Sequence, residues 1–442
     1  MCSDTTHHSI SPIQPIRQDW LSDMPSVIIP FLALYLSVFL LMAGIGLLGT
    51  YLPLRLTVDG TSTQAIGLVM SLYFLGMCLG ALYCSRLIKG VGHIRAFAAF
   101  VSLTTALVML HGLFISPVSW GLLRFLAGFS TIGVYTVIES WLNECTAPTS
   151  RGRVMSVYMI VCYLGMGSGQ FFLNIGHVQN TALFLVISLL LVLCIVPVVV
   201  TRSIHPELPE FGQVNMVRLF RKAPVGMLGC FLAGLLNGAF YSMFPVFCHK
   251  IGLLVTSLAT VMSVTILSGL ALQWPVGAIS DRFDRTYVLG SISLGIALIS
   301  AVVVFAADHS FILFLASMIL FGGFTFTVYP VAVARAHDLF EPADIVPASS
   351  ALLLCYCIGG TAGPTLASLT MMTSGTAYGF FGYCFLVSLV SAITIFYLRK
   401  KEIITIVSVE DSSTFVAMKS TSPAAVLLDP RTDLSDIQAP DR

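Results

Sequence analysis

Charged side chains are scarce in this chain. Only 10% of its 442 residues are Asp, Glu, Lys or Arg, whereas a soluble globular protein usually carries about 25%. The formal net charge is +1, so the sequence lacks the basic surplus of a nucleic-acid-binding protein. It also lacks a G-x(4)-G-K-[ST] loop, which argues against ATP hydrolysis. These shortages exclude an ordinary soluble enzyme, a disordered protein and a polyanion-binding protein.

Hydrophobic residues make up 57% of the chain, and the mean hydropathy is +0.92. A membrane helix needs about 20 consecutive apolar residues. The two longest uncharged stretches, Val154–Thr201 and Ile345–Leu398, each suffice for two helices, with polar breaks at Asn174–Thr181 and Thr373–Tyr378. The sequence therefore predicts an all-α membrane protein with twelve transmembrane helices. The other uncharged stretches and spans are Met24–Leu54, Gly60–Ser85, Ala96–Leu123, Trp120–Asn143, Ala223–Cys248, Ile251–Ser280, Thr286–Ala307 and Phe311–Ala334.

The basic residues between these spans are unevenly distributed. If the amino terminus is cytoplasmic, fifteen Lys and Arg residues fall in inward loops and at the inner edge of the last span. Only Arg55 and Lys250 fall in outward loops. Cytoplasmic loops carry an excess of basic residues, so both termini are expected to be cytoplasmic.

Nine of the 11 cysteines lie inside apolar runs, where we expect small buried hydrophobic side chains rather than disulfides or metal ligands. The histidines are scattered without a ligand pattern. No cofactor and no metal site are expected. The segment after Lys401 is rich in Ser, Thr, Asp and Pro and is predicted to be a mostly disordered tail.

An internal duplication divides the predicted bundle. Gly46 and Pro53 recur 192 residues later as Gly238 and Pro245, and a G-x-x-x-G pair at 165–169 recurs at 359–363. A polar segment lies between the two copies. The expected organisation is a cytoplasmic tail at 1–26, a six-helix half at 27–201, a cytoplasmic linker at 202–223, a second six-helix half at 224–398 and a disordered cytoplasmic tail at 399–442.

The loop after the eighth predicted helix reads Gly277-Ala-Ile-Ser-Asp281-Arg282-Phe-Asp284-Arg285. It resembles the G-x-x-x-D-R-x-G-R loop of the major facilitator superfamily, with Asp284 where Gly is usual. The matching loop of the first half is more degenerate, since Lys89 replaces the Asp. The resemblance covers residues 27–398. It implies two pseudo-symmetric six-helix halves that rock around a central site.

Two further segments carry the same resemblance. Glu139-Ser-Trp-Leu-Asn143, together with Tyr329-Pro330, is similar to a bacterial branch of poorly assigned transporters, which implies a multi-pass protein of the bacterial inner membrane. The connection after the fourth helix is similar to the superfamily's E-x(6)-R-G element. Charged residues of these loops would clamp the inner side, or serve only as orienting or solvated charge. The candidate gating residues are Glu144, Arg151, Arg153, Asp281, Arg282 and Arg285.

In the superfamily, helices 1, 4, 7 and 10 line the central cavity. On the fourth predicted helix, Arg124, Gly128, Thr131, Tyr135 and Glu139 share one face about 80° wide at 100° per residue. Arg124-Phe-Leu-Ala-Gly128 resembles the R-x-x-x-G element of proton-coupled antiporters, with snorkelling of Arg124 to the interface as the alternative. The candidate cavity residues are Arg124, Thr131, Tyr135, Glu139, Asn237, Tyr241, Thr325 and Tyr329.

Glu139 is the acidic residue that lies well inside a predicted span. A charged acid at the centre of a membrane helix costs about 2.5–3.5 kcal/mol on insertion scales, so it needs a partner or a use. One hypothesis makes it a proton carrier that couples transport to the pH gradient. The other makes it a static ion pair with Arg153 or Arg335. The residues leave both open.

The sequence therefore favours a secondary active transporter of a small organic solute that works by alternating access, with proton coupling as an open option. A non-transporting membrane sensor or scaffold on the same fold is the alternative, and a lipid-modifying enzyme is disfavoured by the absence of a nucleophile constellation. The expected partners are a small-molecule substrate, protons and the lipid bilayer, with no nucleic acid. We expect a monomer.

Overall fold

The structure is a computed structural model that describes residues 29–147, 150–200, 216–340, 344–401, 415–422 and 424–425. Among these residues, twelve helices are long and apolar enough to cross a membrane. The predicted fold class is therefore confirmed. Most of the predicted linker and the amino-terminal tail lie outside the described residues, although residues Met216–Lys222 of the linker form a short helix, α9.

The helices follow the predicted spans, and the predicted breaks at 174–181 and 373–378 separate α7 and η3 from α8, and α14 from α15. In chain order, after the short turn η1 (Ile29–Phe31), the elements are α3 (Leu32–Val58), α4 (Thr63–Val91), α5 (His93–Leu113), α6 (Pro117–Glu144), α7 (Arg151–Gly169), η3 (Gln170–Ile175), α8 (Ala182–Val200), α10 (Pro224–Lys250), α11 (Val255–Ser280), α12 (Arg285–His309), α13 (Phe311–His337), α14 (Ile345–Thr373) and α15 (Gly379–Lys401).

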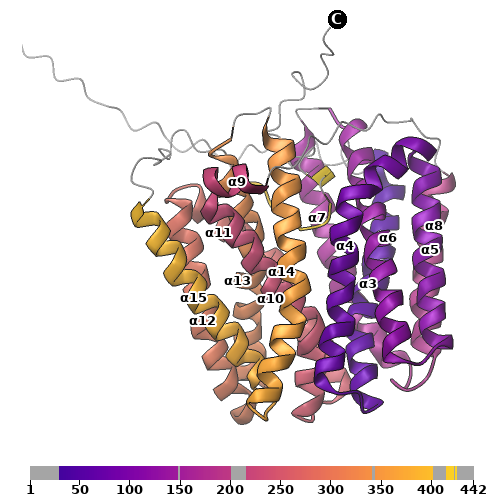
Figure 1. Cartoon of the computed structure of the whole chain (residues 1–442). Coiled ribbons are helices and arrows are strands. Elements are labelled where there is room, and N and C mark those ends of the chain that lie inside the picture. The colour runs from indigo at the N-terminus through magenta and orange to yellow at the C-terminus, as the bar shows by residue number, and fades with distance from the viewer. Residues whose placement is uncertain are drawn as a thin grey trace, which may run out of the picture.

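The helices stand side by side in two groups, α3–α8 and α9–α15 (Figure 1). We call the end of the bundle that holds Gly92, Arg151 and Asp284 the basic end. It is uppermost in Figure 1 and corresponds to the side predicted to be cytoplasmic. The end that holds Asp59, Gly252 and Gly375 is the opposite end. Each of the twelve long helices runs from one end of the bundle to the other. The position of a residue along its helix therefore sets its distance from the basic end.

Two turns at the opposite end share one geometry. Gly60 follows α3 with φ +79°, and Gly252 follows α10 with φ +77°. Only glycine adopts positive φ without a steric cost. The two positions are 192 residues apart, the spacing at which the sequence repeats elsewhere. The local structure thus agrees with the duplication that the sequence indicates.

Replacing Gly60 by alanine is expected to lower the free energy of unfolding by about 1–2 kcal/mol, because a Cβ atom is strained at positive φ. Gly90→Ala is the matched control. Gly90 lies in α4 with open space around the position of a Cβ and no positive φ, so alanine there should be neutral or stabilising. Unfolding titrations of both variants measure the difference. Equal stabilities would contradict the strained turn.

The G-x-x-x-G pairs pack helices within each group. A Cβ atom on Gly169 of α7 would lie 2.4 Å from the carbonyl oxygen of Ala43 in α3. One on Gly363 of α14 would lie 2.3 Å from the carbonyl oxygen of Leu235 in α10. Both distances are far below van der Waals contact, so these backbones touch because the side chains are absent. The small residues of these motifs thus allow close helix packing.

Contacts between the two groups hold the opposite end together. Near this end, Lys250 Nζ donates to Thr63 Oγ1 at 2.7 Å, and Ser71 Oγ lies 2.8 Å from Thr365 Oγ1. A Cβ atom on Gly67 of α4 would collide with Ser368 of α14 at 2.4 Å. Access to the space between the groups is therefore closed by tight α4–α14 packing on this side.

A segment of the carboxyl-terminal tail lies between the groups toward the basic end. We call residues 415–422 and 424–425 the tail segment. Its Met418, Thr421 and Ala424 are buried, with at most 4% of each residue exposed. The prediction of a disordered tail is therefore wrong for this segment, because its apolar residues and hydroxyls find partners on helices far away in the sequence. Residues 402–414 and 426–442 lie outside the described residues.

Candidate functional site

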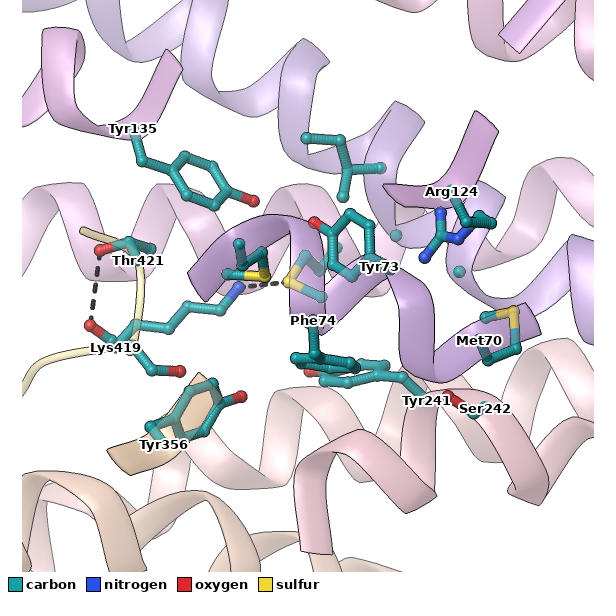
Figure 2. Close-up of a pocket in the computed structure, with 16 residues that line it drawn as sticks. Met70, Tyr73, Phe74, Arg124, Tyr135, Tyr241, Ser242, Tyr356, Lys419 and Thr421 are labelled. Atoms are coloured by element: carbon teal, nitrogen blue, oxygen red, sulfur yellow. Dashed lines mark hydrogen bonds between the residues drawn. The ribbon is translucent and has the colours of Figure 1, made fainter. Parts of the chain in front are cut away.

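A cavity lies between the two groups at the middle of the bundle. The space that atoms leave unfilled there, including space open to solvent, is about 670 Å³. Helices from both groups and the tail segment contribute to its wall (Figure 2). The lining residues are Ile45, Gly46, Gly49, Met70, Tyr73, Phe74, Met77, Arg124, Tyr135, Met166, Tyr241, Ser242, Tyr356, Lys419, Ser420 and Thr421.

Close packing of α4 on α6 positions the arginine of this cavity. A Cβ atom on Gly128 would lie 1.9 Å from the carbonyl oxygen of Tyr73, and one on Gly76 would lie 1.9 Å from that of Phe125. The two backbones therefore touch, and the side chains of neighbouring residues meet. Arg124 Cζ lies 4.1 Å from the centre of the Tyr73 ring, which is a cation–π contact worth about 2 kcal/mol when desolvated.

Arg124 is a buried cation without an anion. It is 4% exposed, and its Nε atom has no hydrogen-bond partner. Among the described residues, none forms an ion pair with Arg124. Burying a charge in a low-dielectric site is costly unless an opposite charge or hydrogen bonds compensate. The Tyr73 ring compensates only in part. The site is therefore electrostatically complementary to a negative group.

Aromatic side chains form another part of the lining, beside methionines, small residues and the tail segment. Phe74 and Tyr356 approach from the two groups with ring centres 6.4 Å apart, and Tyr135 and Tyr241 also line the cavity. The hydroxyl of Tyr241 has no hydrogen-bond partner. No Asp or Glu occurs among the lining residues. Aromatic faces, the Tyr241 hydroxyl and two basic side chains, Arg124 and Lys419, suit an organic anion with a planar or apolar body.

Three of the eight residues predicted to face the cavity do so: Arg124, Tyr135 and Tyr241. The other five do not line this cavity. Thr131 donates to the carbonyl oxygen of its own helix at Ala127, 2.7 Å away. Tyr329 packs edge-on against Tyr356 with ring centres 5.3 Å apart. Glu139, Asn237 and Thr325 are buried but do not line the cavity. The polar face of α6 extends further along the bundle than the cavity does, so only some of its residues line the cavity.

Sequence reasoning missed the contribution of α4 and α14. Tyr73, Phe74 and Tyr356 supply much of the aromatic wall, but the superfamily pattern assigns the cavity to other helices. The tail residues Lys419, Ser420 and Thr421 were also missed. The available signal was the apolar and hydroxyl-rich run within an otherwise polar tail, from Phe415 to Ala425.

Glu139 lies in α6 between the cavity and the basic end, and it is fully buried. Tyr158 OH donates to Glu139 Oε1 at 2.9 Å. The hydroxyls of Thr421 and Ser422 donate to its two carboxylate oxygens. Neither Arg153 nor Arg335 is among these partners, so the static ion pair that the sequence left open is wrong for this conformation. The carboxylate is held by three hydroxyls.

The loop between α11 and α12 forms an ion-pair network within its own group. Arg285 NH2 lies 2.9 Å from Asp281 Oδ1, and Arg285 NH1 lies 2.6 Å from Asp338 Oδ1. Asp284, the residue that departs from the superfamily pattern, caps α12 through the Thr286 amide at 2.8 Å. Its other oxygen pairs with Arg399 Nε at 2.6 Å, so the substitution ties this loop to α15.

The remaining candidate gating residues lie at the same end. Glu144 and Arg282 are exposed, whereas Arg151 is buried at the start of α7. Asp281 binds Arg285 and the amide of Phe415, 2.7 Å away, and pairs with neither Arg151 nor Arg153. A clamp between Asp281 and these arginines is therefore not formed in this conformation.

Comparisons with known proteins agree with this architecture. The family model described as Major Facilitator Superfamily matches residues 34–307 and 252–427. An uncharacterized MFS-type transporter of Yersinia enterocolitica is 31% identical over 348 residues, which are 77% of this chain and 89% of the relative. The MFS-type transporter YcaD of Escherichia coli, also described as uncharacterized, is 30% identical over 344 residues, with the same two coverages.

Two solved structures share the fold. The nucleoside transporter NupG has a TM-score of 0.70 at 12% identity, covering 85% of this chain and 99% of that chain. A bacterial homolog of the human lysosomal transporter Spinster, in an inward-facing and occupied conformation, has a TM-score of 0.67 at 14% identity, covering 88% and 99%. These likenesses show the fold. With the family match over most of the chain, they establish that this protein belongs to the Major Facilitator Superfamily and is a non-enzymatic membrane transporter.

Proposed function

We propose that this protein is a secondary active transporter that moves a small organic anion with an aromatic or apolar body by alternating access. The observation that carries the proposal is the buried, anion-free Arg124 in an aromatic cavity between two helix groups. An uncompensated cation is costly at membrane depth. A substrate carboxylate or similar negative group would compensate that charge when it binds. The free energy lost by burying Arg124 would then be recovered as binding free energy of the substrate.

The contacts between the two helix groups at each end of the bundle support alternating access to the cavity. The opposite end is closed by α4–α14 packing, and the cavity is separated from the basic end by the tail segment. We assign the basic end to the cytoplasm of a bacterial cell, as the distribution of Lys and Arg predicts. In an outward-facing state, Glu144, Arg151 and Arg153 of the first group would meet Arg282 and the Asp281–Arg285 network of the second group and clamp the basic end.

Glu139 is the proposed site of proton coupling. Its partner on the helices, the Tyr158 hydroxyl, can rotate to donate to a carboxylate or accept from a carboxylic acid, and none of its hydrogen-bond partners among the described residues is a cation. Protonation therefore breaks no ion pair. A monomer suffices for the cycle, because both groups that enclose the cavity belong to one chain.

A sensor or scaffold on the same fold is the alternative. Such a protein needs no buried cation facing a cavity, whereas this chain retains one despite its energetic cost. The cavity thus favours transport over a purely structural role.

Uptake into proteoliposomes tests the proposal. Vesicles containing the purified protein, either as the full chain or shortened to end at Glu410, would be offered radiolabelled benzoate and benzamide, which have nearly the same shape but differ in charge. Uptake would be measured with and without an inward pH gradient, and protein-free vesicles give the background from passive entry of benzoic acid. We expect uptake of benzoate, or of other aromatic carboxylates in the same panel, to exceed that of the matched amides at least tenfold. Equal or absent uptake of every carboxylate and amide pair would overturn the anion assignment.

A further inference from the structure

The tail segment joins both helix groups at the places where transport would require movement. Toward the second group, the Phe415 amide donates to Asp281 Oδ1 at 2.7 Å. The Phe415 ring lies against Gly277, where a Cβ atom would be 2.3 Å from its Cδ1. Toward the first group, Thr421 and Ser422 donate to Glu139. The tail segment, of which the structure describes ten residues, therefore bridges the two halves of the candidate machinery.

The same segment forms one wall of the cavity. Ser420 and Thr421 line it, and the Lys419 side chain reaches into it (Figure 2), with Nζ 5.6 Å from the centre of the Tyr163 ring. Hydrogen bonds between residues close in sequence fold the segment on itself. Thr421 N donates to Lys419 O at 2.9 Å, and Ala424 N donates to Ser422 Oγ at 3.1 Å. The segment is a compact turn rather than an extended strand passing by.

We propose that the tail segment is a built-in plug, which closes the cavity from the basic end and holds the transporter in a resting state until it is displaced. While docked, it occupies both oxygens of Glu139 and the Asp281 carboxylate, so these residues cannot serve a transport cycle. It also ties the two helix groups together, which opposes their rocking.

The docked state is built to be reversible. Lys419 is half-buried without a carboxylate within ion-pairing distance among the described residues, and its desolvation lowers the pKa of the ammonium group. That desolvation opposes docking, whereas the buried Met418, Thr421 and Ala424 favour it. Because the tail is tethered, docking is intramolecular, and an effective concentration in the millimolar range suffices to keep the plug in place.

A cysteine reporter tests the plug without any knowledge of the substrate. Gly49 lines the cavity, and a Cβ atom there meets no atom within 4 Å, so Gly49→Cys fits. Its rate of reaction with a water-soluble maleimide would be measured in purified protein, with the same chain lacking the reporter as background. A chain that ends at Glu410 lacks the plug. The matched control ends at Ala425 and keeps it.

We expect the reporter to react at least tenfold faster in the chain ending at Glu410 than in the full chain, while the chain ending at Ala425 reacts as slowly as the full chain. A synthetic peptide of residues 415–425 at millimolar concentration should slow the reaction of the shorter chain again. In the full chain, Thr421→Val with Ser422→Ala should give an intermediate rate. If the short chain is unstable, this double variant supplies the comparison.

Equal reporter rates in the full chain, the chain ending at Glu410 and the double variant would overturn the plug, as would a peptide that leaves the rate unchanged. The outcome is independent of the proposed substrate. Labelling requires no transport, so a failure of the anion assignment would leave these rates as predicted.

Discussion

Glu139→Gln is expected to abolish solute accumulation driven by a pH gradient while leaving solute exchange across the membrane intact. Glutamine keeps the shape of the side chain and an oxygen that accepts from Tyr158, but it cannot carry a proton. A gradient of one pH unit is worth about 1.4 kcal/mol per proton, enough for about tenfold accumulation if one proton moves with each solute. The variant should show no accumulation. Counterflow of labelled solute in proteoliposomes measures the exchange that remains.

The control for this experiment is Asp308→Asn. Asp308 lies near the end of α12 and is exposed, so its replacement should leave accumulation unchanged. Both variants are best compared in the chain ending at Glu410, which removes the effect of Glu139 on tail docking. Accumulation that persists in Glu139→Gln would end the proton-carrier assignment.

Arg124→Gln is expected to reduce binding of an anionic substrate by about thirtyfold to several thousandfold. Removing one partner of a buried charge pair costs about 2–5 kcal/mol, and each 1.4 kcal/mol is a factor of ten. Binding would be measured by the stabilisation of the purified protein against heat in the presence of benzoate, with benzamide as the neutral probe. Stabilisation by benzoate should disappear in the variant.

Arg124→Lys is the matched substitution, because lysine keeps the charge but not the planar guanidinium that contacts Tyr73. It should weaken binding less than glutamine does. If Arg124→Gln and Arg124→Lys bind benzoate as well as the parent does, the arginine does not recognise the anion and serves only to pack against Tyr73.

The residues that recognise a solute could be predicted only in part. Arg124, Tyr135 and Tyr241 were found because a polar side chain in an apolar helix is conspicuous. Tyr73, Phe74 and Tyr356 were not, because an aromatic residue in a membrane helix is compatible with lipid, core or cavity alike. Their role depends on the close approach of α4 to α6 and of the two groups to each other, which no local pattern specifies.

The partners of Glu139 illustrate the same limit. Because Glu139 lies within a predicted span, its negative charge needs a compensating partner. Arginines at the basic end were the natural candidates for an ion pair. The structure instead supplies one hydroxyl from α7 and two from residues about 280 positions further along the chain. Such a contact is set by how the tail returns to the bundle, and sequence separation carries no information about it.

The sequence by itself determined the number, order and approximate bounds of the twelve spans. Backbone hydrogen bonds of a membrane helix are satisfied within one continuous apolar segment, so the information is local. The duplication was equally legible, because it is a repeat of local features. The cavity, the environment of Arg124 and the docking of residues 415–425 were decided only by the tertiary structure. They arise where segments distant in sequence meet, and a polar or aromatic side chain takes its function from the neighbours it finds there.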